Sequence, residues 1–271
     1  AAGDSQAKGF LIGATSGRTT LNGEGLQHQD GHSHILSSTI PNCLSYDPTF
    51  SYEIAVIIKD GIQKMYVEQK NYFYYITTMN ENYEHPPMPK GAEEGIIKGM
   101  YKLLPAKKPV IRLLGSGSIL NESIKAKELL STYGVESEVW SVTSFNLLRK
   151  DGMEIERINQ LNPTKKEQKT YVEECFEDNP VPVVASTDYM RSYAEQIRPY
   201  VNSDYTVLGT DGFGRSDSRE SLREFFEIDA NSIVRAAAYT LHKNKIMDKA
   251  QLKKIYDDIE VDPLKPNPWE V

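Results

Sequence analysis

The 271-residue sequence lacks the marks of several protein classes. Its only two cysteines, Cys43 and Cys175, have no ligand-like spacing, so neither a disulfide framework nor a structural zinc is expected, and both are predicted to be buried thiols. Lys and Arg number 31 against 38 Asp and Glu, and the net charge of −7 argues against nucleic-acid binding. No apolar run approaches the ~20 residues that span a bilayer, and no signal-peptide pattern opens the sequence. We therefore predict a cytoplasmic protein without a membrane partner.

The composition is that of an ordinary folded protein, with 39% hydrophobic and 25% charged residues. This length suits one large domain or two ordinary ones. Three prolines crowd residues 85–89, where they stop regular structure and stiffen the chain. We place a domain boundary there and predict domains at residues 1–90 and 91–271.

The first of these segments is expected to form strands around one helix. Ile54, Ile58, Ile62 and Met65 recur at helical spacing and predict an amphipathic helix with these side chains on its buried face. The strands, predicted from aromatic and β-branched runs, begin near Gly9 and cover Thr39–Tyr46 and Tyr72–Thr78. The polar, glycine-rich residues 23–34 between the first two strands are predicted to form a loop.

In the second segment, strands again alternate with helices, a pattern typical of a parallel α/β sheet. Asp229 is expected to cap a closing helix whose buried positions are Val234, Ala237, Ala238 and Leu241. The other predicted elements are strand Val110–Leu114, helix Ser118–Tyr133, strand Ser137–Val142, strand Pro182–Ser186 and strand Tyr205–Gly209. The proline-containing tail from Val261 is expected to lie extended on the surface.

The segment GEGLQHQDGHSHI, residues 23–35, holds three of the five histidines, His28, His32 and His34. Because Glu24 and Asp30 lie in the same loop, we expect these carboxylates to fix the imidazole tautomers and raise the pKa values toward neutrality. Such imidazoles donate hydrogen bonds to a substrate oxyanion or move a proton near pH 7.

Two other interpretations of the same loop remain open. The imidazoles could simply cap the helix that follows. Alternatively His28, His32, His34 and Asp30 could ligate zinc or iron in a metal-dependent hydrolase.

Three further segments follow predicted strands and favour structural roles. Gly115-Ser116-Gly117-Ser118 lacks the third glycine of a dinucleotide fingerprint and the lysine of a P-loop, so it predicts a tight turn rather than a nucleotide site. Residues 210–219 predict a turn and a helix N-cap, although Arg215 and Arg219 could bind a carboxylate or a neighbouring subunit. Ser186-Thr187-Asp188-Tyr189 predicts a strand end entering a helix cap.

Read together, six segments resemble one family. They are GFLIGATSGRTTLNGEGLQHQDGHSHI, TIPNCLSYDP, YYITTMNENY, LLGSGSIL, ASTDYMR and LGTDGFGRSDSRE, beginning at Gly9, Thr39, Tyr74, Leu113, Ala185 and Leu208. The chain resembles, almost throughout, the homodimeric bacterial first (decarboxylating, acetyl-transferring) component of pyruvate dehydrogenase, an oxidoreductase of the transketolase superfamily. The resemblance implies the later part of a pyrimidine-binding thiamine diphosphate domain followed by a transketolase C-terminal-like open α/β domain.

The resemblance also implies that the sequence is the C-terminal part of a longer enzyme. Members of this family use thiamine diphosphate and Mg²⁺, held by a Gly-Asp-Gly motif with a downstream Asn, and this sequence contains no Gly-Asp-Gly. The glutamate that activates the cofactor should lie upstream of Ala1. We therefore expect no complete cofactor-binding set, no tight cofactor binding and no activity from this chain alone.

In the intact enzyme, the resemblance implies decarboxylation of pyruvate and transfer of the two-carbon unit to a lipoyl group of the dihydrolipoyl acetyltransferase component. His28 would face the thiazolium, while Asp30 and His34 match the superfamily's Asp-Gly-x-x-His segment near the substrate. His32-Ser33 replaces the common Pro-Thr, so His32 receives no direct role. The implied partners are a second copy, the N-terminal portion and the acetyltransferase. A non-catalytic dimerisation or docking module is the remaining alternative.

Overall fold

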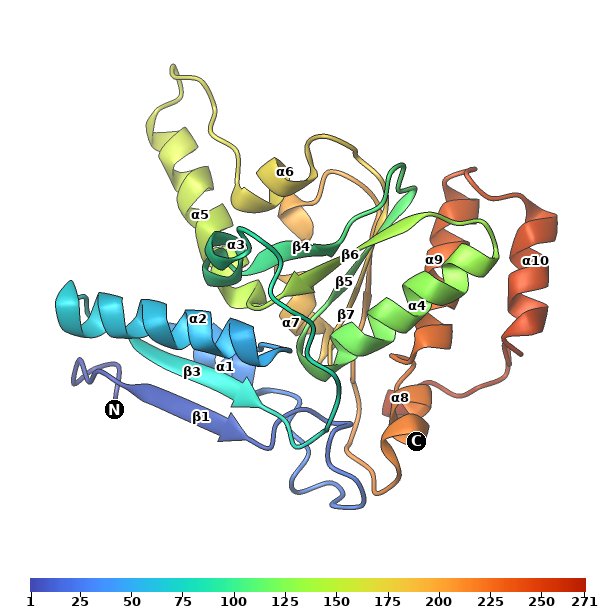
Figure 1. The fold of residues 1–271 in the computed structure, drawn as a ribbon, viewed down its shortest axis with the longest axis horizontal. Helices are drawn as coiled ribbons and strands as arrows, with labels where there is room; N and C mark the ends of the chain where they lie inside the picture. The colour runs from blue at the N-terminus through green and yellow to red at the C-terminus, as the bar shows by residue number, and fades with distance from the viewer.

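Two β-sheets and the helices around them form the structure, a computed structural model that describes residues 1–271 (Figure 1). Sheet A contains the first three strands and sheet B the other five. The elements built around sheet A are β1 (Phe10–Ala14), α1 (Ser33–Ser38), β2 (Cys43–Tyr46), α2 (Ser51–Ile62) with a π-helical turn at Gln63–Val67, and β3 (Phe73–Thr78).

The remaining elements build and cover sheet B (Figure 1). They are α3 (Glu93–Lys98), β4 (Met100–Leu104), β5 (Ile111–Gly115), a 3₁₀ turn at Gly117–Ile119, α4 (Leu120–Thr132), β6 (Ser137–Val142), α5 (Phe145–Leu161), α6 (Tyr171–Phe176), β7 (Val183–Ser186), α7 (Arg191–Glu195), a 3₁₀ turn at Arg198–Tyr200, β8 (Tyr205–Leu208), α8 (Arg219–Phe225), α9 (Ala230–Lys243), α10 (Lys249–Asp258) and a 3₁₀ turn at Pro268–Glu270. No helix combines the length and apolar character that crossing a membrane requires.

Sheet A is parallel with strand order β1-β3-β2, and α2 packs on it. The predicted helix is present, but the predicted buried face is only partly right. Ile62 is exposed, whereas Ile57 and Gly61 are buried. A Cβ at Gly61 would lie 2.7 Å from the Phe10 ring, so glycine here permits the close approach of helix and sheet.

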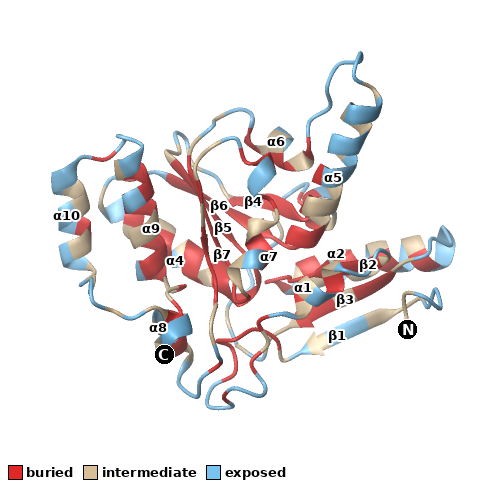
Figure 2. Ribbon diagram, turned by 180° about the vertical axis from the view of Figure 1, so that it is seen from behind, coloured by how far each residue is buried: buried red, intermediate tan, exposed pale blue.

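Sheet B has the order β4-β6-β5-β7-β8, and every pair is parallel except β4 with β6. β5 and β7 are buried along their whole lengths, as central strands covered on both faces are (Figure 2). The predicted parallel strands are present, and Asp229 caps α9 by accepting from the Ser232 amide at 3.1 Å. The thiol predictions hold for buried Cys43, whereas Cys175 is only half-buried.

A single hydrophobic cluster of 32 residues runs through both halves of the chain, from Leu44 to Ile255. A buried carboxylate also joins them. Glu53, at the start of α2, accepts from Tyr101 Oη on β4 at 2.7 Å and from Ser141 Oγ on β6 at 2.6 Å. The predicted division at residues 85–89 falls between the two sheets and stays a prediction.

Candidate active site

Polar residues gather where the carboxyl ends of the parallel strands of both sheets face one another. Asp47 follows β2, Thr77 lies at the end of β3, and Asp188 follows β7. In open α/β proteins, ligands bind at this edge of the sheet. All three side chains are almost completely buried, which makes the region an interior polar cluster.

Asp188 fixes the segment that follows β1. Its carboxylate accepts from the Thr19 amide at 3.1 and 3.2 Å and from the Thr19 hydroxyl at 2.8 Å. Burial raises the pKa of Asp188 to about 7, whereas Arg223 and these hydrogen bonds act to lower it. The predicted helix cap at this position is wrong, because α7 begins only at Arg191 and Asp188 bonds a segment far away in sequence.

Asp47 is the second buried acid. One carboxylate oxygen, Oδ1, accepts from Thr77 Oγ1 at 2.7 Å, while Oδ2 has no hydrogen-bond partner. Burial raises the pKa of Asp47 to about 7. The turn after β5 closes over this group: Gly117 has φ of +52°, and a Cβ there would lie 2.8 Å from both carboxylate oxygens. The Gly115–Ser118 segment is thus a tight turn, as predicted.

His34 is fully buried between aromatic rings, stacked 4.8 Å from Tyr193 and edge-on at 4.7 Å to Tyr189. Its Nε2 lies 3.0 Å from Thr77 Oγ1. Because that hydroxyl donates to Asp47, Nε2 carries the imidazole proton and donates to Thr77. The hydroxyls of both tyrosines and His34 Nδ1 have no partner.

The electrostatic expectation for this imidazole is wrong. Burial lowers the pKa of His34 to about 3, although Asp30 acts in the opposite direction. Removing the ring from water destabilises the charged imidazolium by more free energy than the attraction of one nearby carboxylate provides. His34 is therefore a neutral imidazole at physiological pH and a fixed hydrogen-bond donor.

Asp30 starts α1. Its Oδ1 accepts from the amides of His32 and Ser33, each at 3.0 Å, and its Oδ2 accepts from the Ser33 hydroxyl. The amide of Ser33, the first residue of α1, thus binds a carboxylate, and the N-cap residue His32 makes no side-chain cap hydrogen bond, which corrects the helix-cap interpretation of the histidines. His32 Nε2 instead accepts from Arg18 Nη2 at 3.2 Å.

His28 lies at the exposed part of the loop, with 59% of its side chain accessible and Nε2 4.0 Å from Glu24 Oε2. The three residues proposed as catalytic are close in sequence, with His28 and Asp30 in the loop before α1 and His34 within α1, but their surroundings differ. His28 is exposed, Asp30 binds backbone amides and His34 is buried. No group of three or more His, Cys, Asp or Glu side chains is placed to hold a metal ion. The structure does not favour the metal-dependent hydrolase interpretation.

Residues 210–219 support this loop from the other half of the chain. Ser218 caps α8 by accepting from the Ser221 amide at 3.2 Å, as the turn-and-cap prediction required. Arg219 Nε donates to the Thr20 carbonyl at 2.9 Å, and Asp211 accepts from the Arg191 amide at 3.0 Å. Binding of a carboxylate or a neighbouring subunit by Arg215 and Arg219 stays a prediction, and Arg219 makes contacts within the chain.

Sequence reasoning missed Asp47, Thr77, Tyr189 and Tyr193. One available signal was positional, because Asp47 directly follows a predicted strand, as Asp188 does. Their contact with the histidine loop depends on how the two sheets pack, which no local pattern reports.

Comparisons with known proteins agree with this architecture. Residues 1–86 match the family described as pyruvate dehydrogenase E1 component middle domain, and residues 99–229 match the transketolase-like TK C-terminal domain. The pyruvate dehydrogenase E1 component of Pseudomonas aeruginosa is 58% identical over all of this chain, which spans 31% of that relative. That of Escherichia coli K12 is 57% identical, with 99% of this chain and 31% of the relative covered.

Among solved structures, a transketolase from Pichia stipitis superimposes with a TM-score of 0.63 at 19% identity, covering 87% of this chain and 30% of the transketolase. This likeness concerns the fold alone. Together these matches confirm the predicted α/β class and the predicted pairing of a middle-domain segment with a transketolase C-terminal-like domain. The chain spans about 31% of the length of the curated relatives it matches.

Proposed function

Since the chain belongs to the pyruvate dehydrogenase E1 component family, we propose that it forms part of a thiamine diphosphate-dependent oxidoreductase that decarboxylates pyruvate. The two-carbon unit would pass to a lipoyl group of the dihydrolipoyl acetyltransferase component. The observation that carries this proposal is 58% identity to a named relative across the whole chain. The enzyme is expected to work in the cytoplasm as a homodimer.

The residues of this chain do not fit the charged end of the cofactor. A diphosphate–Mg²⁺ group needs oxygen ligands gathered around the ion. No such cluster of His, Cys, Asp or Glu is present, and the sequence contains no Gly-Asp-Gly motif. The cofactor's phosphate contacts would then come from the rest of the enzyme, and the chain alone would bind thiamine diphosphate and Mg²⁺ weakly.

Of the residues to which the family resemblance gives a role, His28 has the accessibility that proton transfer to a substrate needs. Its exposed imidazole, beside Glu24, would hold or protonate an oxygen of the pyruvate-derived group. Asp30 and His34 would act on the same substrate region by position: Asp30 fixes the end of the loop, and His34 presents a neutral ring. A histidine that stays uncharged adds no competing positive charge beside the reacting group.

The proposal is tested by titrating thiamine diphosphate with Mg²⁺ into the isolated chain by calorimetry. Weak or absent binding is expected, and tight stoichiometric binding would refute the idea that the phosphate anchor lies elsewhere.

A second experiment addresses activity. The corresponding region of the Escherichia coli relative, 57% identical, is replaced by this chain. Pyruvate decarboxylation by the chimera supports the enzymatic function. A folded, cofactor-loaded chimera without decarboxylation would favour the non-catalytic docking alternative.

A further inference from the structure

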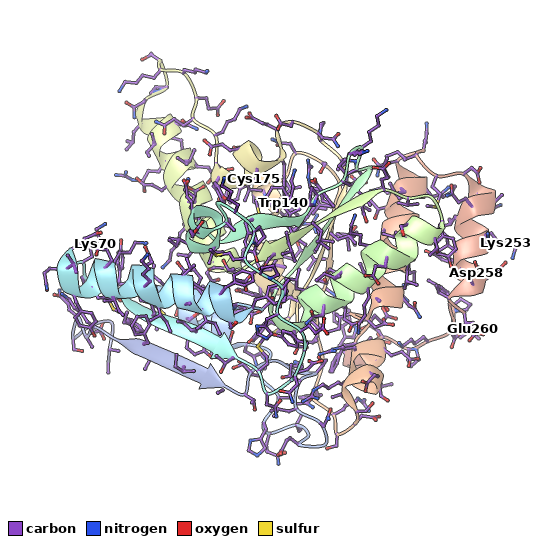
Figure 3. All side chains as sticks on the ribbon, in the orientation of Figure 1. Lys70, Trp140, Cys175, Lys253, Asp258 and Glu260 are labelled. Atoms are coloured by element: carbon purple, nitrogen blue, oxygen red, sulfur yellow. The ribbon has the colours of Figure 1, made fainter.

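A cavity of about 630 Å³ opens at the end of sheet B opposite the candidate active site. It is lined by the β4–β5 connection, the start of β5, α6 and the segment that leads into β7. These are the amino ends of parallel strands whose carboxyl ends carry Ser116 and Asp188. In Figure 3 the labelled Cys175, which lines this cavity, lies far from the loop that follows β1.

A buried guanidinium group, that of Arg112, is among the groups that line the cavity. The Arg112 side chain is only 3% exposed, and its Nε donates to Glu138 Oε1 at 2.5 Å. The guanidinium carbon lies 4.6 Å from the centre of the Phe176 ring. The Phe176 ring and Glu138 therefore both hold the guanidinium group in place. Its Nη1 is buried and has no hydrogen-bond partner. A buried donor left unpaired costs free energy, which a bound acceptor would recover.

The charge around this guanidinium is positive, although the whole chain carries −7. Glu138 is already neutralised, because Lys102 Nζ lies 3.1 Å from its Oε2 and Arg112 binds its Oε1. Lys107 and Lys108 also line the cavity, are exposed and make no salt bridge. Asp178 is the one other acid in the lining. Three cationic residues with unused donors, Arg112, Lys107 and Lys108, therefore line one cavity.

We propose that this cavity binds a small molecule through a phosphate or diphosphate group. A guanidinium held in place and two exposed ammonium groups that line the same cavity suit an acceptor with several oxygens and more than one negative charge. A cavity of this size has room for a metabolite rather than only an ion. This inference does not rest on the proposed function, and the site would act at a distance from the histidine loop.

The test is calorimetric titration of inorganic phosphate and of inorganic pyrophosphate into the full 271-residue chain at low salt. The double variant Lys107→Ala/Lys108→Ala removes only exposed side chains. We expect it to weaken pyrophosphate binding at least about tenfold, the loss of roughly one charge-assisted hydrogen bond. Arg112→Lys keeps the charge but loses the planar set of guanidinium N–H donors. If thermal unfolding shows that this variant stays folded, it should weaken pyrophosphate binding about as much as the double lysine variant does.

The matched control is Lys165→Ala/Lys166→Ala, which removes the same charge from an exposed pair between α5 and α6. It should leave binding within about twofold, since exposed distant charges are screened. Equal weakening by the two double variants would show non-specific attraction and overturn the proposal. So would the absence of binding of both anions to the unmodified chain.

Discussion

Gln29 and Arg215 exchange two hydrogen bonds: the Gln29 side-chain amide donates to the Arg215 carbonyl at 2.6 Å, and the Arg215 amide donates to Gln29 Oε1 at 2.8 Å. The glutamine is buried although His28 beside it is exposed. One side chain thus satisfies both backbone groups of a residue far along the chain. The histidine loop is consequently fastened next to its exposed imidazole.

Removing this fastening should loosen the loop. Gln29→Ala is expected to destabilise the protein by roughly 1–3 kcal/mol, because it leaves the Arg215 amide and carbonyl without their partner. Hydrogen exchange should accelerate in residues 23–31 and 213–217. Gln27→Ala, at an exposed position of the same loop, is the control and should change neither. Equal exchange in the two variants would show that the Gln29 bridge does not hold the loop.

The Thr77 hydroxyl links His34 to Asp47, and its removal should leave both side chains without a hydrogen bond. Thr77→Val keeps the shape but leaves His34 Nε2 without its acceptor and Asp47 Oδ1 without its donor. We expect a loss of ~2–4 kcal/mol in the free energy of unfolding, from two buried polar groups. The His34 Nε2 proton should also shift in NMR spectra.

Thr78→Val is the matched control for this change, because Thr78 lies next on the same strand and its side chain makes no hydrogen bond. If the two valine variants unfolded at the same denaturant concentration, the link through Thr77 would contribute nothing.

Asp47 should make the fold less stable as pH rises. Its pKa in the folded protein is about 7, above its ordinary 3.8, so the folded state holds the proton more tightly than the unfolded state. This contribution is complete below 3.8 and is lost as pH rises to about 7. Asp188 acts in the same direction, its pKa also being raised by burial to about 7.

Asp47→Asn removes one of these two titrations. Over that range, unfolding free energy should fall less steeply with pH in the variant, by up to ~1.4 kcal/mol per pH unit. Urea unfolding at several pH values measures the slopes, with Asp4→Asn as an exposed control for loss of one charge. Parallel slopes for wild type and Asp47→Asn would mean that Asp47 does not hold its proton.

Alanine substitutions at two glycines can distinguish the cost of backbone strain from the cost of close packing. Gly117 and Gly134 both have positive φ, +52° and +75°, but only Gly117 faces a neighbour, the Asp47 carboxylate. Gly134→Ala should cost ~1–2 kcal/mol from backbone strain alone. Gly117→Ala should cost at least ~1 kcal/mol more, because the new methyl group displaces a buried carboxylate. Thermal unfolding measures the difference, and equal costs would mean that the turn and Asp47 are not in tight contact.

Structural features that depend on neighbouring residues could be predicted from the sequence, whereas features that depend on contacts between distant residues could not. Strands such as Ser137–Val142 and the Asp229 cap follow from local residue types and are confirmed. The edge strand Met100–Leu104 was missed because its short, mixed pattern gains its meaning only from pairing with β6. The sequence also could not show that α2 turns Ile57 and Gly61, rather than Ile62, toward the sheet.

The site shows the same limit. The histidine cluster was visible in sequence, but the structure places His28 in the loop and His34 in α1, and their electrostatics depend on distant partners. His34 loses its expected charge because Tyr189 and Tyr193, from the other half of the chain, enclose it. Asp188 bonds Thr19 across 169 positions, and no pattern of nearby residues predicts that contact.

We propose that His28 presents the reacting imidazole of a pyruvate-decarboxylating site that the rest of the enzyme completes. It is tested most directly by His28→Gln in the chimera with the Escherichia coli relative, with His85→Gln, also exposed, as control. We expect kcat to fall by about 10²–10⁴-fold for His28→Gln, with thiamine diphosphate affinity unchanged and the control fully active. Normal turnover by the His28→Gln chimera would contradict it.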